Sequence, residues 1–193
     1  MNEDIIKKSK DLLESTKSTS LSERINSLKT KIAVMSHNKN TCLLCDTSGS
    51  MNSFVVNSED NISKRAIDVL DNVLKNFVGA NIYSFNTTCK KVDSLPAPGG
   101  GTDLAGAFCT IKSDSIKELI LLTDGQPDDE HAALKAAQKL KINIIYIGPA
   151  PTPQFLIKLA KITGGKFDSV ELLLQGKNAD SVLENKIRGF LNA

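Results

Sequence analysis

The chain has 193 residues, a length that corresponds to one domain with an appendage. Its 24 basic and 22 acidic residues give a net charge of +2, which argues against a general nucleic-acid binder, because such binders cluster cations against phosphates. Hydrophobic residues make up 40% of the chain and charged residues 24%, as in a folded globular domain. The sequence contains no apolar run near the roughly 20 residues that span a bilayer, so we expect no membrane partner.

The first 36 residues are expected to form a helical extension that precedes the main domain, residues 37–193. Apolar residues recur at helical spacing between Leu21 and Met35. Ser20 and Glu23 have the spacing of a capping box, which marks a helix start. Two interpretations remain open at this point: the helical stripe packs on its own domain, or it binds a partner.

From residue 41 onward, apolar strand-like runs alternate with amphipathic segments. The expected strands are Thr41–Cys45, Asn81–Phe85, a short Thr88–Val92, Glu118–Thr123, Ile142–Ile147 and an edge strand Phe167–Val170. The expected helices are Ile62–Phe77, Asp103–Ile111, Asp129–Lys141, one capped by Thr152 and ending at Ile162, and Ala179–Leu191. This alternation predicts an α/β fold in which a mainly parallel sheet lies between two layers of helices.

Four cysteines are too few and too scattered for a disulfide framework, which favours a reducing, cytoplasmic location. The amino-terminal residues also lack the uninterrupted apolar core of a signal peptide. Cys42 and Cys45 form a C-x-x-C motif, but they lie three positions apart in an expected strand, so their side chains point to opposite faces. We interpret them as buried, inert thiols.

Two aspartates directly follow apolar strands: Asp46 after the first and Asp124 after the strand Glu118–Thr123. The carboxyl ends of parallel strands share one edge of the sheet, where ligands bind in folds of this class. Ser48 and Ser50 alternate with Asp46, so one loop presents three oxygen-bearing side chains at every second position. The glycine-rich loop before Thr102 can bring a further hydroxyl to the same edge.

A set of hydroxyls and a few carboxylates, without histidine or cysteine, suits a hard cation such as Mg²⁺ or Mn²⁺ rather than Zn²⁺. Ca²⁺ is disfavoured because it prefers more carboxylate and carbonyl oxygens. Asp103 has two equally supported interpretations: it orients a ligand hydroxyl, or it is an acid at the start of a helix. Asp128 and Asp129 are interpreted as caps of the following helix.

Three segments together resemble the von Willebrand factor A (vWA) family: DTSGSM at 46–51, GGTDL at 100–104 and LTDG at 122–125. In that family they form the metal-ion-dependent adhesion site (MIDAS). The resemblance covers roughly residues 38–190 and implies a three-layer Rossmann-like fold in which Thr88–Val92 is an antiparallel edge strand. It also implies a metal-ligand set of Asp46, Ser48, Ser50, Thr102 and Asp124.

The resemblance implies a non-enzymatic, divalent-metal-dependent binding module that captures an aspartate or glutamate of a protein partner, with no catalytic residue. Two alternatives remain. In a Mg²⁺-dependent phosphoryl hydrolase Asp46 would be the nucleophile, although a phosphatase of the haloacid-dehalogenase type carries a second aspartate where Ser48 stands. In a structural subunit the metal site would be vestigial, and the helical extension would make the contacts.

Overall fold

The structure is a computed structural model that describes residues 41–57, 63–149, 151–175 and 178–192. The helical extension expected over residues 1–36 lies outside the described residues. In the described part, no helix combines the length and the apolar character needed to cross a membrane.

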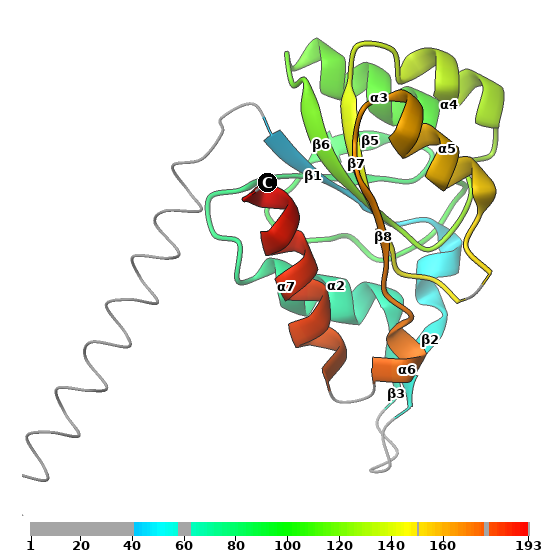
Figure 1. Cartoon of the computed structure of the whole chain (residues 1–193). Helices are drawn as coiled ribbons and strands as arrows, with labels where there is room; N and C mark the ends of the chain where they lie inside the picture. The colour runs from blue at the N-terminus through cyan, green and yellow to red at the C-terminus, as the bar shows by residue number, and fades with distance from the viewer. Residues whose placement is uncertain (1–40, 58–62, 150, 176–177, 193) are drawn as a thin grey trace, which may run out of the picture. The chain divides into compact units, whose positions relative to one another are not determined.

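A six-stranded sheet forms the centre of the fold (Figure 1). Its strands in chain order are β1 (Thr41–Asp46), β4 (Asn81–Phe85), β5 (Cys89–Lys91), β6 (Glu118–Thr123), β7 (Lys141–Tyr146) and β8 (Phe167–Ser169). The spatial order is β5-β4-β1-β6-β7-β8, and every pair is parallel except β4 with β5. The mainly parallel sheet and its antiparallel edge strand are therefore confirmed.

The sheet is covered by helices on both faces. Helices α3 (Leu104–Ser113), α4 (Glu130–Ala136) and α5 (Gln154–Ile162) lie on one side in Figure 1, and α2 (Ala66–Leu74) and α7 (Ala179–Leu191) lie on the other. The predicted three-layer α/β architecture is thus confirmed.

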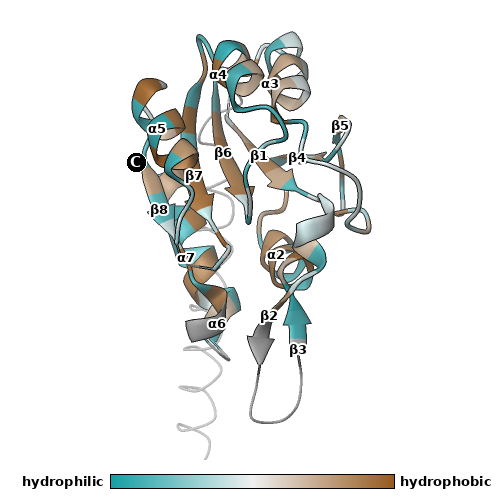
Figure 2. Ribbon diagram, turned by 90° about the vertical axis from the view of Figure 1, so that its right-hand side faces the viewer, coloured by the Kyte–Doolittle hydropathy of each residue, from teal (hydrophilic) through white to brown (hydrophobic). Residues whose placement is uncertain are grey.

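The central strands are apolar along nearly their whole length because both of their faces are covered. Figure 2 shows β1, β6 and β7 as largely hydrophobic. Leu119 and Leu121 of β6 belong to the core cluster beneath α3, α4 and α5, whereas the alternating Ile120 and Leu122, equally buried, lie outside this cluster. Alternation along the strand therefore supplies apolar side chains to both faces of the sheet.

The prediction of a helix over Ile62–Phe77 was wrong at both ends, because α2 spans only Ala66–Leu74. Strands β2 (Phe54–Asn57) and β3 (Ser63–Arg65) form an antiparallel hairpin, and α2 begins only at Ala66. Asp68 fixes this start, because its Oδ2 accepts a hydrogen bond of 3.1 Å from the backbone N–H of Arg65.

Three further helices differ from their expected bounds, and α6 (Leu172–Gln175) was not predicted. Helix α3 spans Leu104–Ser113 rather than Asp103–Ile111. Helix α4 ends at Ala136 rather than Lys141, because the backbone reaches a left-handed conformation at Lys139, with φ of 69°. Helix α5 begins at Gln154, and the N-cap position is occupied by Pro153 rather than Thr152. The predicted bounds Ala179–Leu191 of the last helix are confirmed.

Candidate metal centre

The candidate centre lies at the point where the strand order reverses. The chain leaves β1 for its neighbour β4 on one side and later returns to β6 on the other side. Asp46 is the last residue of β1, and Asp124 follows the last residue of β6. Because β1 and β6 are adjacent and parallel, the two aspartates lie at the same sheet edge, where ligands bind in such folds.

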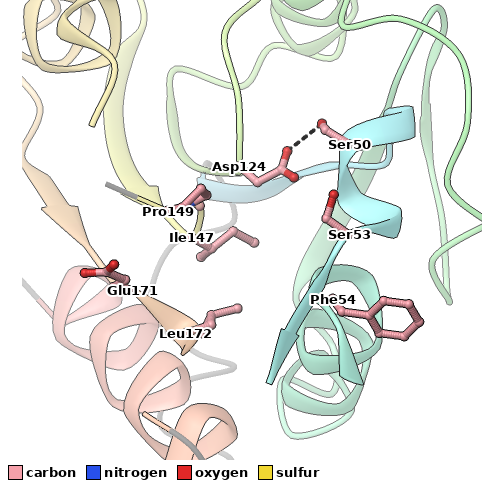
Figure 3. A pocket seen from close by; sticks show the side chains of 9 residues that line it. Ser50, Ser53, Phe54, Asp124, Ile147, Pro149, Glu171 and Leu172 are labelled. Carbon is pink, nitrogen blue, oxygen red and sulfur yellow. Dashed lines mark hydrogen bonds between the residues drawn. The ribbon is translucent and has the colours of Figure 1, made fainter. Parts of the chain in front are cut away.

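A chain of hydrogen bonds joins four of the five predicted metal ligands. The backbone N–H of Ser48 donates to Asp46 Oδ1 over 2.8 Å, and the hydroxyls of Ser48 and Ser50 lie 3.1 Å apart. Ser50 Oγ then donates to Asp124 Oδ1 over 2.8 Å, as Figure 3 shows. The predicted convergence of these four residues is therefore present in the structure.

The fifth predicted ligand, Thr102, is positioned through its backbone. Its N–H donates to Asp128 Oδ2 over 2.8 Å, and its carbonyl accepts from the Asp128 N–H over 3.1 Å. The glycine-rich loop that carries Thr102 is also joined to the first loop, because Gly49 N–H donates to Gly100 O over 3.1 Å. These bonds hold together the three loops that bear the predicted ligands.

Sequence reasoning assigned Asp128 to helix capping, and this was wrong. The N-cap of α4 is Asp129, whose side chain accepts from the Ala132 N–H over 2.9 Å. Asp128 instead anchors the Thr102 loop, and a Cβ added at Gly101 would lie 2.5 Å from Asp128 Oδ2. A side chain at position 101 would therefore have to displace the Asp128 carboxylate.

Thr123 is a second contributor that sequence reasoning missed. Its hydroxyl donates to Asp46 Oδ2 over 2.6 Å, and both residues are buried. A polar residue that directly follows the apolar run of residues 119–122 in β6 was the available signal. Thr123 and the Ser48 backbone together occupy one acceptor site on each Asp46 oxygen, which fixes the orientation of the carboxylate.

Asp103 takes the second of its two interpretations. It is the N-cap of α3, and its Oδ1 accepts from the Gly106 N–H over 2.9 Å. This bond satisfies one of the unpaired backbone donors in the first turn of the helix.

Both aspartates of the cluster are held in an environment that disfavours their charge. Burial is the largest cause that raises the pKa of Asp46; hydrogen bonds from Thr123 and Ser48 lower it, and the charge of Asp128 raises it. Burial also raises the pKa of Asp124 to about 6, and the nearby Asp46 charge adds to this, against a lowering bond from Ser50. Two carboxylates close together in a poorly hydrated position are stabilised by a bound cation.

The donor set fits a small hard cation. In the described residues, no group of three or more His, Cys, Asp or Glu side chains is placed to hold a metal; the predicted set instead combines two carboxylates with three hydroxyls. Neighbouring ligands of octahedral Mg²⁺ lie about 3.0 Å apart, given metal–oxygen distances of about 2.1 Å. The 3.1 Å and 2.8 Å separations in the cluster are hydrogen-bond lengths that also match this spacing.

Cys42 and Cys45 lie outside this centre. Both are buried, and only Cys42 belongs to the core cluster beneath α3, α4 and α5, as expected for side chains on opposite faces of β1. Burial raises the pKa of Cys42 to about 12 and that of Cys45 well above its ordinary value. Their interpretation as inert thiols agrees with this environment.

No protein-family model and no curated protein matches the sequence, but solved structures are similar to it. The manganese-loaded TRAP protein of Plasmodium vivax aligns with a TM-score of 0.53 at 16% identity, over 80% of this chain and 74% of that one. The von Willebrand factor type A protein from Catenulispora acidiphila aligns with a TM-score of 0.56 at 17% identity, over 78% of this chain. The alignment spans 41% of that second protein. The strand order, the helix layers and these two neighbours together establish that the chain has the fold of a von Willebrand factor A domain.

Proposed function

We propose that this protein is a divalent-metal-dependent binding module that captures an aspartate or glutamate side chain of a protein partner. The observation that supports this most directly is the hydrogen-bonded chain from Asp46 through Ser48 and Ser50 to Asp124, at the reversal point of the sheet. Side chains that are distant in sequence and rich in hard oxygen atoms are gathered there.

The proposed ligands of the metal are Asp46, Ser48, Ser50, Thr102 and Asp124. Mg²⁺ or Mn²⁺ is the proposed ion, since both prefer oxygen ligands. The similar TRAP structure from Plasmodium vivax is manganese-loaded. Bound there, the ion would supply a positive centre with an open position for an outside oxygen.

The chain's own residues orient the site and leave the coordination of the ion incomplete. Thr123 and the Ser48 backbone fix the Asp46 carboxylate, and Ser50 fixes that of Asp124. Two carboxylates balance the charge of a dication but cannot fill an octahedron. A carboxylate from a partner would complete the coordination, and this makes partner binding depend on the metal.

The proposal includes no catalysis. A phosphatase that uses Asp46 as nucleophile needs a proton donor near it, but the residue two positions later is Ser48, which is 1% exposed and whose hydroxyl lies against Ser50. Turnover of p-nitrophenyl phosphate that is lost in Asp46→Asn would overturn this part of the proposal.

The proposed function is tested in two steps with the full chain. Mn²⁺ binding is measured by the loss of the free-ion electron paramagnetic resonance signal, for the wild type and for Asp46→Ala; we expect one bound ion in the wild type and none in the variant. Circular dichroism of Asp46→Ala checks that the variant is folded. Failure of the folded wild type to bind millimolar Mn²⁺ or Mg²⁺ contradicts the proposal.

Partner capture is then measured on immobilised wild type and Asp124→Asn, each in Mg²⁺ and in EDTA. We expect the partner protein to be retained by the wild type in Mg²⁺, but not by the wild type in EDTA and not by Asp124→Asn in either buffer. Retention that is unchanged by EDTA would instead support a structural subunit with a vestigial metal site.

A further inference from the structure

A pocket of about 260 Å³ adjoins the metal-ligand cluster and shares Ser50 and Asp124 with it. Figure 3 shows Ser50 and Ser53 on one side, with Ile147, Pro149 and Leu172 on the other and Asp124 between them. The pocket is therefore continuous with the candidate metal centre and has an apolar side that the centre itself lacks.

The apolar side of the pocket is rigidly built. Ile147 and Leu172 are 0% and 1% exposed, so they form the packed core behind the pocket, and the exposed apolar side chains among its lining residues are Pro149 and Phe54. The carbonyl of Pro149 accepts a hydrogen bond of 2.8 Å from the Tyr146 hydroxyl, which holds the rim in place. Preformed apolar surface of this kind binds a ligand with little ordering cost.

The mouth of the pocket is open, and an exposed apolar residue, Phe54, lies at its rim. Ser50 and Ser53 are exposed there, and Phe54 is 65% exposed, with a ring that points away from Ile147 and Leu172 in Figure 3. Aromatic residues are enriched at protein–protein interfaces, so Phe54 is available to a segment that enters the pocket.

The size and charge of the pocket restrict its occupant. A volume of about 260 Å³ is below the roughly 300–1,000 Å³ of sites for drug-sized ligands, and suits one side chain. The charged side chains that line it are those of Asp124 and Glu171, both acidic, so a second carboxylate would be repelled. Acidic groups alone would attract a basic side chain, but a dication bound at Asp124 would offset the charge of that carboxylate. The apolar part of the lining then favours an uncharged aliphatic side chain, while the neighbouring metal centre favours an acid.

We propose that the pocket binds an aliphatic side chain located two residues from the acidic residue that the metal centre captures. This inference rests on the proposed function and specifies its partner: an extended segment with the pattern aliphatic-x-acid or acid-x-aliphatic. In an extended chain, side chains two positions apart lie on the same face, about 7 Å from each other. They can therefore enter two sites that share Ser50 and Asp124.

The test uses the full chain and three labelled nine-residue peptides, with binding measured by fluorescence anisotropy in Mg²⁺ and in EDTA. The first peptide has the core Leu-Ala-Glu-Ala-Leu, which covers both directions. In the second, both leucines are alanine; in the third, the glutamate is glutamine. All three carry the same lysine-containing ends for solubility.

We expect the first peptide to bind in Mg²⁺ roughly ten times more tightly than the alanine peptide, because burial of one leucine side chain is worth at least that factor. The glutamine peptide should bind at least tenfold more weakly than the first, because it lacks the charge for the metal. In EDTA the preference for the leucine peptide should disappear.

A pocket-filling variant separates the two sites. Ser53→Leu places an apolar side chain at the exposed mouth, and it should remove the tenfold preference for leucine but leave binding of the alanine peptide unchanged. Ser113→Leu is the matched control: Ser113 is also exposed and ends α3, shortly before β6 begins, so it lies at the opposite sheet edge. The Ser113→Leu variant should still bind the leucine peptide about ten times more tightly than the alanine peptide.

Each other result has a distinct meaning. Equal Mg²⁺-dependent binding of the leucine and alanine peptides overturns the pocket inference and leaves the proposed function intact. No Mg²⁺-dependent binding of any peptide contradicts both. Equal binding of the first peptide and the glutamine peptide shows an apolar site independent of the acid, which overturns the inference. Mg²⁺-dependent self-association that Ser53→Leu removes would identify a second copy of this chain as the occupant, and would also overturn it.

Discussion

Asp124→Asn is the substitution that most directly tests the electrostatics of the metal centre. Asparagine keeps the shape of the side chain and the oxygen that accepts from Ser50 over 2.8 Å, but it removes the charge. We expect this variant to be more stable than the wild type without a divalent cation and less stable with Mg²⁺. The reversal distinguishes a ligand carboxylate from one with a merely structural role.

The magnitude follows from the environment of Asp124. The pKa of its carboxyl is raised from 3.8 to about 6, and at about 1.4 kcal/mol per tenfold change in proton affinity the ionised form costs the folded state at most about 3 kcal/mol. A raised folded pKa lowers stability increasingly between pH 3.8 and about 6, so the full cost applies at pH 7.5. Because Asp124 is partly exposed, solvent screening reduces this to ~1–2 kcal/mol.

Mg²⁺ acts in the opposite direction on the wild type. At a concentration one hundred times its Kd, a ligand that binds only the folded state adds about 2.7 kcal/mol. For a chain of this length each kcal/mol corresponds to a Tm change of about 2–4 °C. We therefore expect the metal-free variant to melt about 2–8 °C above the wild type, and the wild type to melt above the variant in saturating Mg²⁺.

The assay is thermal unfolding followed by circular dichroism at pH 7.5, in chelator-treated buffer and in a Mg²⁺ series. Asp103→Asn is the control, because an N-cap accepts asparagine as well as aspartate; it should match the wild type in both conditions. If Asp124→Asn is no more stable than the wild type when both are metal-free, the inferred cost of the Asp124 charge to the folded state is refuted. An equal Mg²⁺ response in Asp124→Asn and the wild type refutes the ligand role of Asp124.

Three further predictions concern the residues that support the site and the cysteines. Thr123→Val should lower the free energy of unfolding in urea by about 1–3 kcal/mol, because it removes a hydrogen bond to buried Asp46, whereas Thr123→Ser should have little effect. Gly101→Ala should weaken Mg²⁺ binding measured by calorimetry, since its Cβ would displace the carboxylate that anchors the neighbouring loop; Gly99→Ala, which meets no atom within 4 Å, should leave the affinity unchanged. Iodoacetamide at pH 8 should label exposed Cys109 first in mass spectrometry, and rapid labelling of the two buried cysteines would contradict their inert assignment.

Much of the fold was readable from local patterns. The apolar runs of β1, β6 and β7 and the stripe of α7 identified these elements, because a strand or helix that must bury a face repeats apolar residues at the matching period. The hairpin of β2 and β3 was missed because the amphipathic pattern over residues 62–77 continues through its second strand. The Asp68 contact with the Arg65 backbone N–H sets the real start of α2.

The proposed ligands were selected from the sequence because their signals are local: an acid that ends an apolar strand, and hydroxyls at alternate positions after it. The residues that hold them were not. Thr123 acts on Asp46 from 77 positions away, and Asp128 acts on Thr102 from 26 positions away. Neither has a spacing that distinguishes it from an ordinary strand end or helix cap.

The sequence alone thus determined which side chains are chemically suited to a hard cation and at which strand ends they occur. The tertiary structure decided which of those ends are neighbours, which buried groups orient the carboxylates, and that an apolar pocket adjoins them. The physical reason is that secondary structure follows from periodicity along the chain. The pocket and the supporting hydrogen bonds instead depend on strand order, which joins residues that no local pattern connects.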